Sequence, residues 1–140
     1  MVVADHKILR KEEDSVDEDT VLLVVLDRYT QWIQAYPSRS KNNIENASAL
    51  RTFMGPQQTP QHVYTDSAAE YNLALAALKW PHDVSTPHRS ETNGVSERAV
   101  RRVREGTAAM MVQSNFDSPW WSWAARCYCF HRCTVDSLIG

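Results

Sequence analysis

The chain has 140 residues, of which 43% are hydrophobic and 23% are charged, and this size and composition fit one globular domain with a buried core. It contains no apolar run of about eighteen residues, and its N-terminus lacks a basic region followed by an apolar segment. The sequence therefore predicts neither a membrane span nor a secretory signal, and we expect an intracellular protein.

Charge is distributed unevenly along the chain, although the formal net charge is only −2. Acids crowd residues 11–20, while arginines crowd residues 89–104. Because a strongly basic balance is the usual mark of a nucleic-acid-binding protein, the total charge gives no such signal. The distribution does, since an anionic partner should meet the arginine-rich half.

Three short segments rich in β-branched residues predict the first strands, over residues 2–9, 20–26 and 32–36. The second segment is continuously apolar, which is typical of a strand covered on both faces of its sheet. The connector before the third is short enough for a hairpin, and Pro37 should end the pairing because it has no N–H to donate. We therefore expect an antiparallel meander.

The apolar spacing becomes helical after the third strand, which predicts a mixed α/β chain. A first helix should run from Ser40 to Met54, where Gly55 and Pro56 stop it. The remaining predicted elements are a strand over residues 62–65, a helix over 68–78, a helix over 95–112 after a turn at Asn93-Gly94, and a last helix that Ser118 caps and Pro119 opens.

Aspartates at the ends of predicted strands are candidate metal ligands, because a strand terminus holds a side chain at a fixed point on the rim of a sheet. Asp5, Asp27 and Asp66 all have such positions. Two carboxylates about 4 Å apart repel each other by roughly 4 kcal/mol at an effective dielectric constant near 20, so they stay ionised together only beside a cation. Magnesium prefers oxygen ligands, and a pair of such ions suits phosphoryl displacement.

A single acid, Glu97, precedes a series of closely spaced arginines. Arg101 and Arg104 follow it at helical spacing, so the three side chains share one face of the predicted helix. In one interpretation Glu97 completes a metal-binding cluster and the guanidinium groups bind adjoining phosphates. In the other the helix is only exposed, and Glu97 pairs with Arg101 for about 0.3–0.5 kcal/mol. Helical spacing alone leaves both interpretations open.

Four strings then stand in a distinctive order: Val-Val-Ala-Asp5, Leu-Leu-Val-Val-Leu-Asp27-Arg-Tyr-Thr-Gln-Trp-Ile, Tyr-Thr-Asp66-Ser and Thr-Asn-Gly-Val-Ser-Glu97-Arg. Together they resemble the catalytic core of retroviral and retrotransposon integrases over nearly the whole chain. The stretch from Thr86 to Arg98 is the most specific match. The resemblance implies a ribonuclease-H-like α/β fold, a five-stranded mixed sheet flanked by helices, as one domain over residues 1–140.

The resemblance also implies an activity and a site. The activity is that of a metal-dependent polynucleotidyl transferase, which processes DNA 3′ ends and joins them to target DNA. The implied catalytic triad is Asp5, Asp66 and Glu97, which binds two Mg²⁺ or Mn²⁺ ions. Asp27 instead matches a second-strand aspartate that is not a ligand. Residues matching DNA-contacting positions are His88, Asn93, Arg101 and Arg104.

The resemblance further implies a DNA partner, a homodimer formed through helices such as the last one, and a nuclear location if the substrate is chromosomal DNA. Nothing in the chain resembles the family's zinc-binding N-terminal domain or its C-terminal DNA-binding domain. Those absences, the short spacing between Asp66 and Glu97 and the acidic total charge favour an alternative, a non-catalytic remnant that binds DNA or dimerises. A third hypothesis is a simple metal-dependent nuclease of the same fold.

The C-terminal segment offers two further candidate features. Cys127, Cys129, His131 and Cys133 supply zinc-ligand types, but alternate positions of one helix point in divergent directions, so packing is the favoured interpretation. An odd cysteine count without a second cluster also argues against disulfides. The tryptophans at 120, 121 and 123 could stack on bases, yet we expect them to pack the last helix onto the sheet or a second subunit.

Overall fold

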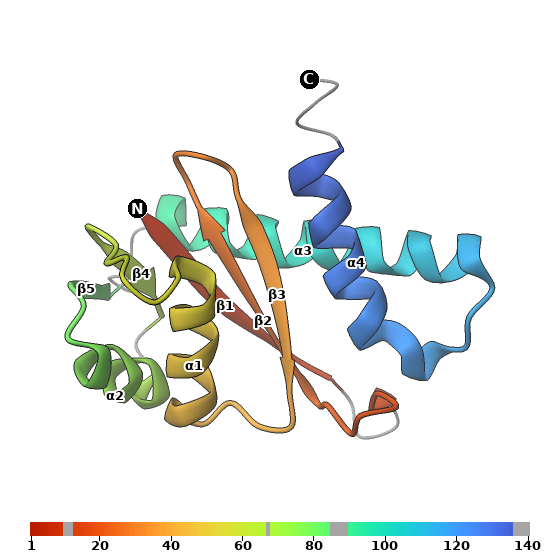
Figure 1. Ribbon diagram of the computed structural model, residues 1–140, viewed down its shortest axis with the longest axis horizontal. Coiled ribbons are helices and arrows are strands. Elements are labelled where there is room, and N and C mark those ends of the chain that lie inside the picture. Colours follow the sequence, from red (N-terminus) through yellow and green to blue (C-terminus); the bar gives the residue numbers. More distant parts are fainter. Residues whose placement is uncertain (10–12, 67, 85–89, 136–140) are drawn as a thin grey trace.

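The computed structural model describes residues 1–9, 13–66, 68–84 and 90–135. Within these residues five strands form one mixed sheet in the order β3-β2-β1-β4-β5 (Figure 1). Their bounds are Val2–Ile8 for β1, Val21–Asp27 for β2, Ile33–Ser38 for β3, Val63–Thr65 for β4 and His82–Val84 for β5. The first three strands pair antiparallel, whereas β4 is parallel to both β1 and β5. The predicted fold class is therefore confirmed.

The antiparallel meander is also confirmed, with one correction at its end. Strand β3 continues past Pro37, which lies opposite Leu22, and reaches Ser38 opposite Val21. The prediction that Pro37 ends the pairing was wrong because β3 is the edge strand of the sheet. An edge strand tolerates proline, since it needs N–H donors on only one side.

The helices are α1, Asn43–Met54; α2, Ala69–Leu78; α3, Ser90–Ser114; a 3₁₀ turn η2, Ser118–Trp120; and α4, Trp121–Thr134. Helix α1 begins after the predicted Ser40, because the Asn42 side chain accepts a hydrogen bond from the backbone N–H of Glu45 and so caps the helix there. Its end at Gly55, which has φ of 88°, agrees with the prediction. In the part of the chain that the structure describes, no helix is long and apolar enough to span a membrane.

Two helix starts in the second half differ from the prediction. Asn93 and Gly94 lie inside α3, which begins at Ser90, so they form no turn. Their local turn preference is weak compared with the packing of a 25-residue helix whose Ala99 and Val103 are buried against the sheet. Before α4, Asp117 rather than Ser118 occupies the cap position, and no side-chain hydrogen bond caps η2.

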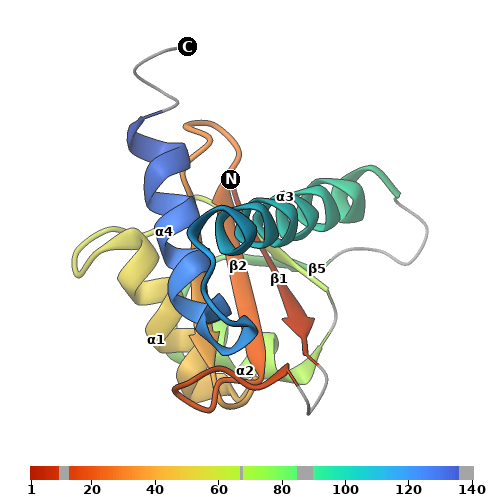
Figure 2. The same ribbon diagram turned by 90° about the vertical axis from the view of Figure 1, so that its right-hand side faces the viewer.

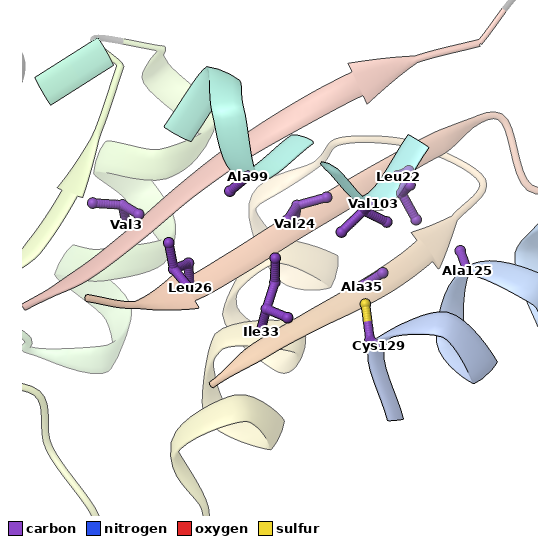
Figure 3. Close-up of a cluster of buried hydrophobic side chains, with 10 residues drawn as sticks. All are labelled: Val3, Leu22, Val24, Leu26, Ile33, Ala35, Ala99, Val103, Ala125 and Cys129. Carbon is purple, nitrogen blue, oxygen red and sulfur yellow. The ribbon is translucent and has the colours of Figure 1, made fainter. Parts of the chain in front are cut away.

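The sheet carries a hydrophobic core on each face. On one face the strand side chains meet α3 and α4 (Figure 3). On the other they meet α1 and α2, as the two views of the ribbon show (Figures 1 and 2). Strand β2 contributes to both cores, since Val24 belongs to the first and Val25 to the second, as expected for a continuously apolar strand.

Strand β1 divides its residues between the two faces by the same alternation. Val3 belongs to the core under α3 and α4, so Asp5 and Lys7 project to that side. Val2 and Ala4 belong to the core under α1 and α2, so His6 projects there. The helix that carries Glu97 therefore covers the face to which Asp5 points.

The crossing of α3 and α4 depends on Gly106. A Cβ atom at this position would overlap the ring of Tyr128 on α4. We expect Gly106→Ala to lower the free energy of unfolding in urea by about 1–3 kcal/mol, because the cost of overpacking exceeds the helix propensity that alanine adds.

Gly94→Ala is the matched control on the same helix. Its Cβ would approach only the flexible guanidinium end of Arg98, at 3.1 Å. Alanine should therefore be neutral there or stabilise the fold by up to about 1 kcal/mol. Equal effects of the two substitutions would show that Tyr128 moves aside and that Gly106 does not set the helix crossing.

Candidate functional site

Asp5 occupies the middle of β1, where it lies opposite Val24 of the neighbouring strand. The side chain is half-buried, and its Oδ1 accepts a hydrogen bond of 2.8 Å from the backbone N–H of His6. On its other side, β1 pairs with β4 only through Val2 and Val3. Asp5 therefore stands just beyond the end of a parallel strand pair, and not at a strand end as the sequence predicted.

Asp66 follows the last residue of β4 directly and is exposed. Its Oδ1 accepts a hydrogen bond of 2.9 Å from the backbone N–H of Ala68, immediately before α2. The hydroxyl of Thr65 donates to the Asp66 carbonyl and also contacts Nε2 of His82, at 2.7 Å. These contacts hold the turn that presents the Asp66 carboxylate beside the open end of the β1–β4 pair.

Glu97 reaches this edge of the sheet from α3, two residues before the buried Ala99. The pKa of Asp5 responds to the charges of the other two acids. Burial raises the pKa of Asp5, the His6 N–H opposes that rise, and the negative charges of Asp66 and Glu97 raise the pKa further. The carboxylates after β4 and on α3 therefore act on the carboxylate of β1.

The donor chemistry of this acidic cluster, Asp5, Asp66 and Glu97, fits a divalent cation. Oxygen ligands are those that Mg²⁺ and Mn²⁺ prefer. Burial is the main cause that raises the pKa of Asp5, and a cation would offset the smaller contribution from the charges of Asp66 and Glu97. Among the described residues, however, no three His, Cys, Asp or Glu side chains are grouped closely enough to hold an ion. Glu97 is exposed on its helix, so closer grouping requires its side chain to turn toward Asp5.

Asp27 has a structural role in the turn after β2. It ends β2 opposite Val2, and its carboxylate accepts hydrogen bonds from the Thr30 hydroxyl at 2.8 Å and the Tyr29 N–H at 3.2 Å. Burial acts to raise the pKa of Asp27, but these hydrogen bonds and the nearby amino terminus of Met1 outweigh it, so that the pKa is lowered. An acid satisfied in this way stabilises the β2–β3 turn.

The predicted DNA-binding residues lie along α3, apart from His88, which is outside the described residues. Asn93 is half-buried, and its carbonyl accepts a hydrogen bond from Ser96. Arg101 and Arg104 are exposed on the face that also carries Glu97. The exposed-helix interpretation named the wrong partner, because Arg101 pairs with Glu105, at 3.0 Å between Nε and Oε1.

On the face of β1 opposite Asp5, His6 makes contacts that the sequence pattern did not indicate. The ring of His6 stacks on Tyr71 with 4.8 Å between centroids, and its Nε2 lies 2.9 Å from Oδ1 of the buried Asn46. Burial lowers the pKa of His6, which keeps the ring neutral between α1 and α2. Glu70 acts electrostatically on His6 and Tyr71, whereas the acids that act on Asp5 are Asp66 and Glu97.

The positions of the three cysteines agree with the packing interpretation. Cys129 is buried in the core below α4, and burial raises the pKa of its thiol to about 12. Cys133 contacts the backbone of Ile33, at 3.2 Å from Sγ to the carbonyl oxygen. Cys127 is exposed, so the three sulfurs point in different directions, as the helical spacing indicated.

Known proteins resemble the chain distantly in sequence and more clearly in fold. No protein-family model matches the chain. The chain is 22% identical over 116 residues to the Retrovirus-related Pol polyprotein from transposon RE2 of Arabidopsis thaliana, a match that covers 79% of this chain and 8% of that protein. The chain therefore spans about one twelfth of the length of this curated relative.

Two solved structures share the fold. The catalytic core domain of BIV integrase superimposes with a TM-score of 0.66 at 15% identity, over 93% of this chain and 80% of that chain. A chain from the simian T-cell lymphotropic virus intasome in complex with PP2A regulatory subunit B56 gamma gives a TM-score of 0.70 at 16% identity, over 93% of this chain and 46% of that chain. The protein thus has the ribonuclease-H-like fold of the retroviral integrase catalytic core and is a distant relative of a retrotransposon Pol polyprotein.

Proposed function

We propose that the chain is a polynucleotidyl transferase of integrase type that depends on Mg²⁺ or Mn²⁺, processes DNA 3′ ends and joins them to target DNA. The observation that carries the proposal is the placement of Asp5 just beyond the end of the β1–β4 pair, on the sheet face that α3 covers, with Asp66 directly after β4. Carboxylates from three separate elements repel one another when they approach, and a divalent cation would stabilise them together.

The roles of the residues follow from their positions. Asp5, fixed in the sheet, and Asp66, exposed beside it, would hold two ions, and Glu97 would complete the set from α3. When bound, such ions activate the nucleophile and stabilise the leaving 3′-oxygen of an in-line displacement. The half-buried position of Asp5 orients one carboxylate, while the exposure of Asp66 leaves its side open to DNA and water.

The face of α3 beyond Glu97 would bind the DNA backbone. Asn93, Arg101 and Arg104 supply an amide and two guanidinium groups along one helix. Arg101 would exchange its exposed ion pair with Glu105 for a phosphate, which costs little because such surface pairs contribute about 0–1 kcal/mol. Binding should therefore weaken steeply as salt concentration rises.

Product analysis tests the proposal. Labelled duplex DNA is incubated with the chain and Mg²⁺ or Mn²⁺, with EDTA as the blank. We expect shortened 3′ ends and larger products in which those ends are joined to a second duplex. Cleavage without joined products would instead identify a nuclease of the same fold.

A second candidate function is a non-catalytic DNA-binding or dimerising remnant. The observation in its favour is that the acids of the described residues are not grouped closely enough to hold an ion. This candidate predicts salt-dependent DNA binding with no metal-dependent product, even at high Mn²⁺ concentration. Any product that disappears with EDTA contradicts it.

We also propose a homodimer formed through α4. Trp123 and Phe130 are 52% and 62% exposed on one side of this helix, with the exposed Cys127 between them. Phe130→Glu should weaken dimerisation at least about thirtyfold in sedimentation experiments, as expected when a charge replaces a buried aromatic anchor. Phe116→Glu is the control, because Phe116 is 63% exposed but lies outside α4. A monomeric wild-type chain, or equal effects of the two substitutions, would contradict this interface.

A further inference from the structure

A cavity of about 610 Å³ lies between the second half of α3, the beginning of β2 and the segment that connects α3 to α4. Its volume is in the range of small-molecule and cofactor sites, about 300–1,000 Å³. Most of its wall is apolar, and the side chains that matter for its chemistry are Val100, Met111, Phe116 and Trp121. A cavity of this kind accepts a flat apolar group.

Residues close in sequence to two members of the acidic cluster line the cavity. Lys7, which lines it, lies two residues after Asp5 on the same face of β1, a rise of about 7 Å. Val100, on the opposite wall, lies less than one helical turn after Glu97. A chain molecule bound at the acidic cluster could therefore place its next unit in the cavity.

Two cations line the cavity and define the charge of its ligand. Lys7 and Arg104 both contribute to the wall, and neither forms an ion pair with any of the described residues. Glu13 is the acid on the wall, and its carbonyl accepts a hydrogen bond from Nε1 of Trp121. A ligand with an apolar body and an anionic group would use both the walls and the cations.

Aromatic side chains form part of the cavity wall. The hydrogen bond from Trp121 to Glu13, 2.6 Å long, fixes the indole at the wall. Phe116 remains 63% exposed although it lines the cavity, and its ring lies 5.9 Å from that of Trp120. Exposed aromatic rings beside cations are typical of sites that stack nucleic-acid bases.

We propose that this cavity binds an unstacked nucleobase of the DNA strand whose phosphate lies at the acidic cluster, with Lys7 and Arg104 on the phosphate of that nucleotide. The inference deepens the proposed function and rests on it, because it assigns the nucleotide next to the reacting phosphate to a second subsite. The short separation of the lining residues Lys7 and Val100 from Asp5 and Glu97, together with the charges of Lys7 and Arg104, favours a nucleotide over an uncharged ligand.

Binding of three duplexes in EDTA tests this inference without requiring catalysis. One duplex ends in an unpaired 2-aminopurine nucleotide, the second carries an abasic nucleotide at the same place, and the third is blunt. Stacking of one base on aromatic rings predicts about tenfold tighter binding of the first duplex than of the abasic one. The fluorescence of 2-aminopurine should also fall on binding.

Two neighbouring alanines of α3 provide matched variants. Ala108 and Ala109 are both exposed, but only Ala108 lines the cavity. Ala108→Leu should fill the cavity and remove the preference for the unpaired base, whereas Ala109→Leu should retain it. Lys7→Gln should weaken binding of the base-bearing duplex more than that of the blunt duplex.

The outcomes of these experiments test the subsite separately from the proposed function. Equal affinity of the wild-type chain for the base-bearing and abasic duplexes overturns the subsite but leaves the proposed function standing. A change in oligomeric state with Ala108→Leu, without loss of base preference, would show that another copy of the chain covers the cavity. Failure to bind any duplex contradicts both the subsite and the proposed function.

Discussion

Asp66→Asn is expected to abolish metal-dependent DNA cleavage and joining while leaving the fold intact. Removing one carboxylate from the acidic cluster removes a charge that holds the cations, and metal stabilisation of a transition state amounts to several kcal/mol. The rate should therefore fall by about a thousandfold or more in a gel assay with labelled DNA ends. Stability should change little, because Asp66 is exposed and asparagine Oδ1 can still accept the hydrogen bond from Ala68.

Glu70→Gln is the control for this experiment. Glu70 lies in the first turn of α2, four residues after Asp66, and its charge acts on His6 and Tyr71. It should therefore be dispensable for cleavage. If Glu70→Gln removes activity and Asp66→Asn retains it, the assignment of the second acid is wrong. Full activity of both variants would place the reaction elsewhere.

Asp5→Asn is expected to stabilise the metal-free chain at neutral pH and to remove its response to Mg²⁺. The pKa of Asp5 is raised in the folded state by burial and by its acidic neighbours, so ionised Asp5 opposes folding. Asparagine removes the charge and keeps an oxygen for the His6 N–H. The melting temperature in EDTA should rise by about 2–8 °C, as a stabilisation of about 1 kcal/mol gives.

The pH dependence has a defined sign. Because the folded state holds the Asp5 proton more tightly, the contribution of Asp5 to stability is fully present below the unfolded pKa of 3.8 and is lost as the pH rises through the folded pKa. The advantage of the asparagine variant should therefore shrink as the pH is lowered through that window. A variant less stable than the wild type at neutral pH in EDTA would contradict this account.

Asp27→Asn should give the opposite result. The pKa of Asp27 is lowered in the fold, so the ionised carboxylate stabilises it above the unfolded pKa, and this contribution is lost as the pH falls through the folded pKa. The variant should melt earlier at neutral pH. Mg²⁺ should raise the melting temperature of the Asp27 variant and the wild type, but not of the Asp5 variant.

The sequence alone predicted the regular elements that carry strong local signals. The continuous apolar run of β2 indicated two covered faces. Gly55 ended α1 where the pattern required it. Prediction from the sequence failed where the local signal was short or weak. Strand β5 has three residues, and Asn93-Gly94 belongs to a helix whose buried face is too far along the chain to be read from that pair.

The candidate site, too, was only partly predictable from the sequence. The order of the four strings was enough to name Asp5, Asp66 and Glu97, and these assignments remain part of the proposed function. Strand pattern alone could not separate Asp5 from Asp27, because both lie on apolar strands. The tertiary structure gives the two carboxylates different surroundings, acidic neighbours in one case and hydroxyl and N–H donors in the other.

The sequence by itself thus determined the fold class and the chemical types available at the site, because these depend on residue order and short-range periodicity. The structure decided that Arg101 pairs with Glu105, that His6 stacks on Tyr71, and that Lys7 faces the same cavity as Arg104. The residues of each of the last two pairs lie on different elements. The packing of the sheet and helices, which no local pattern encodes, brings them together.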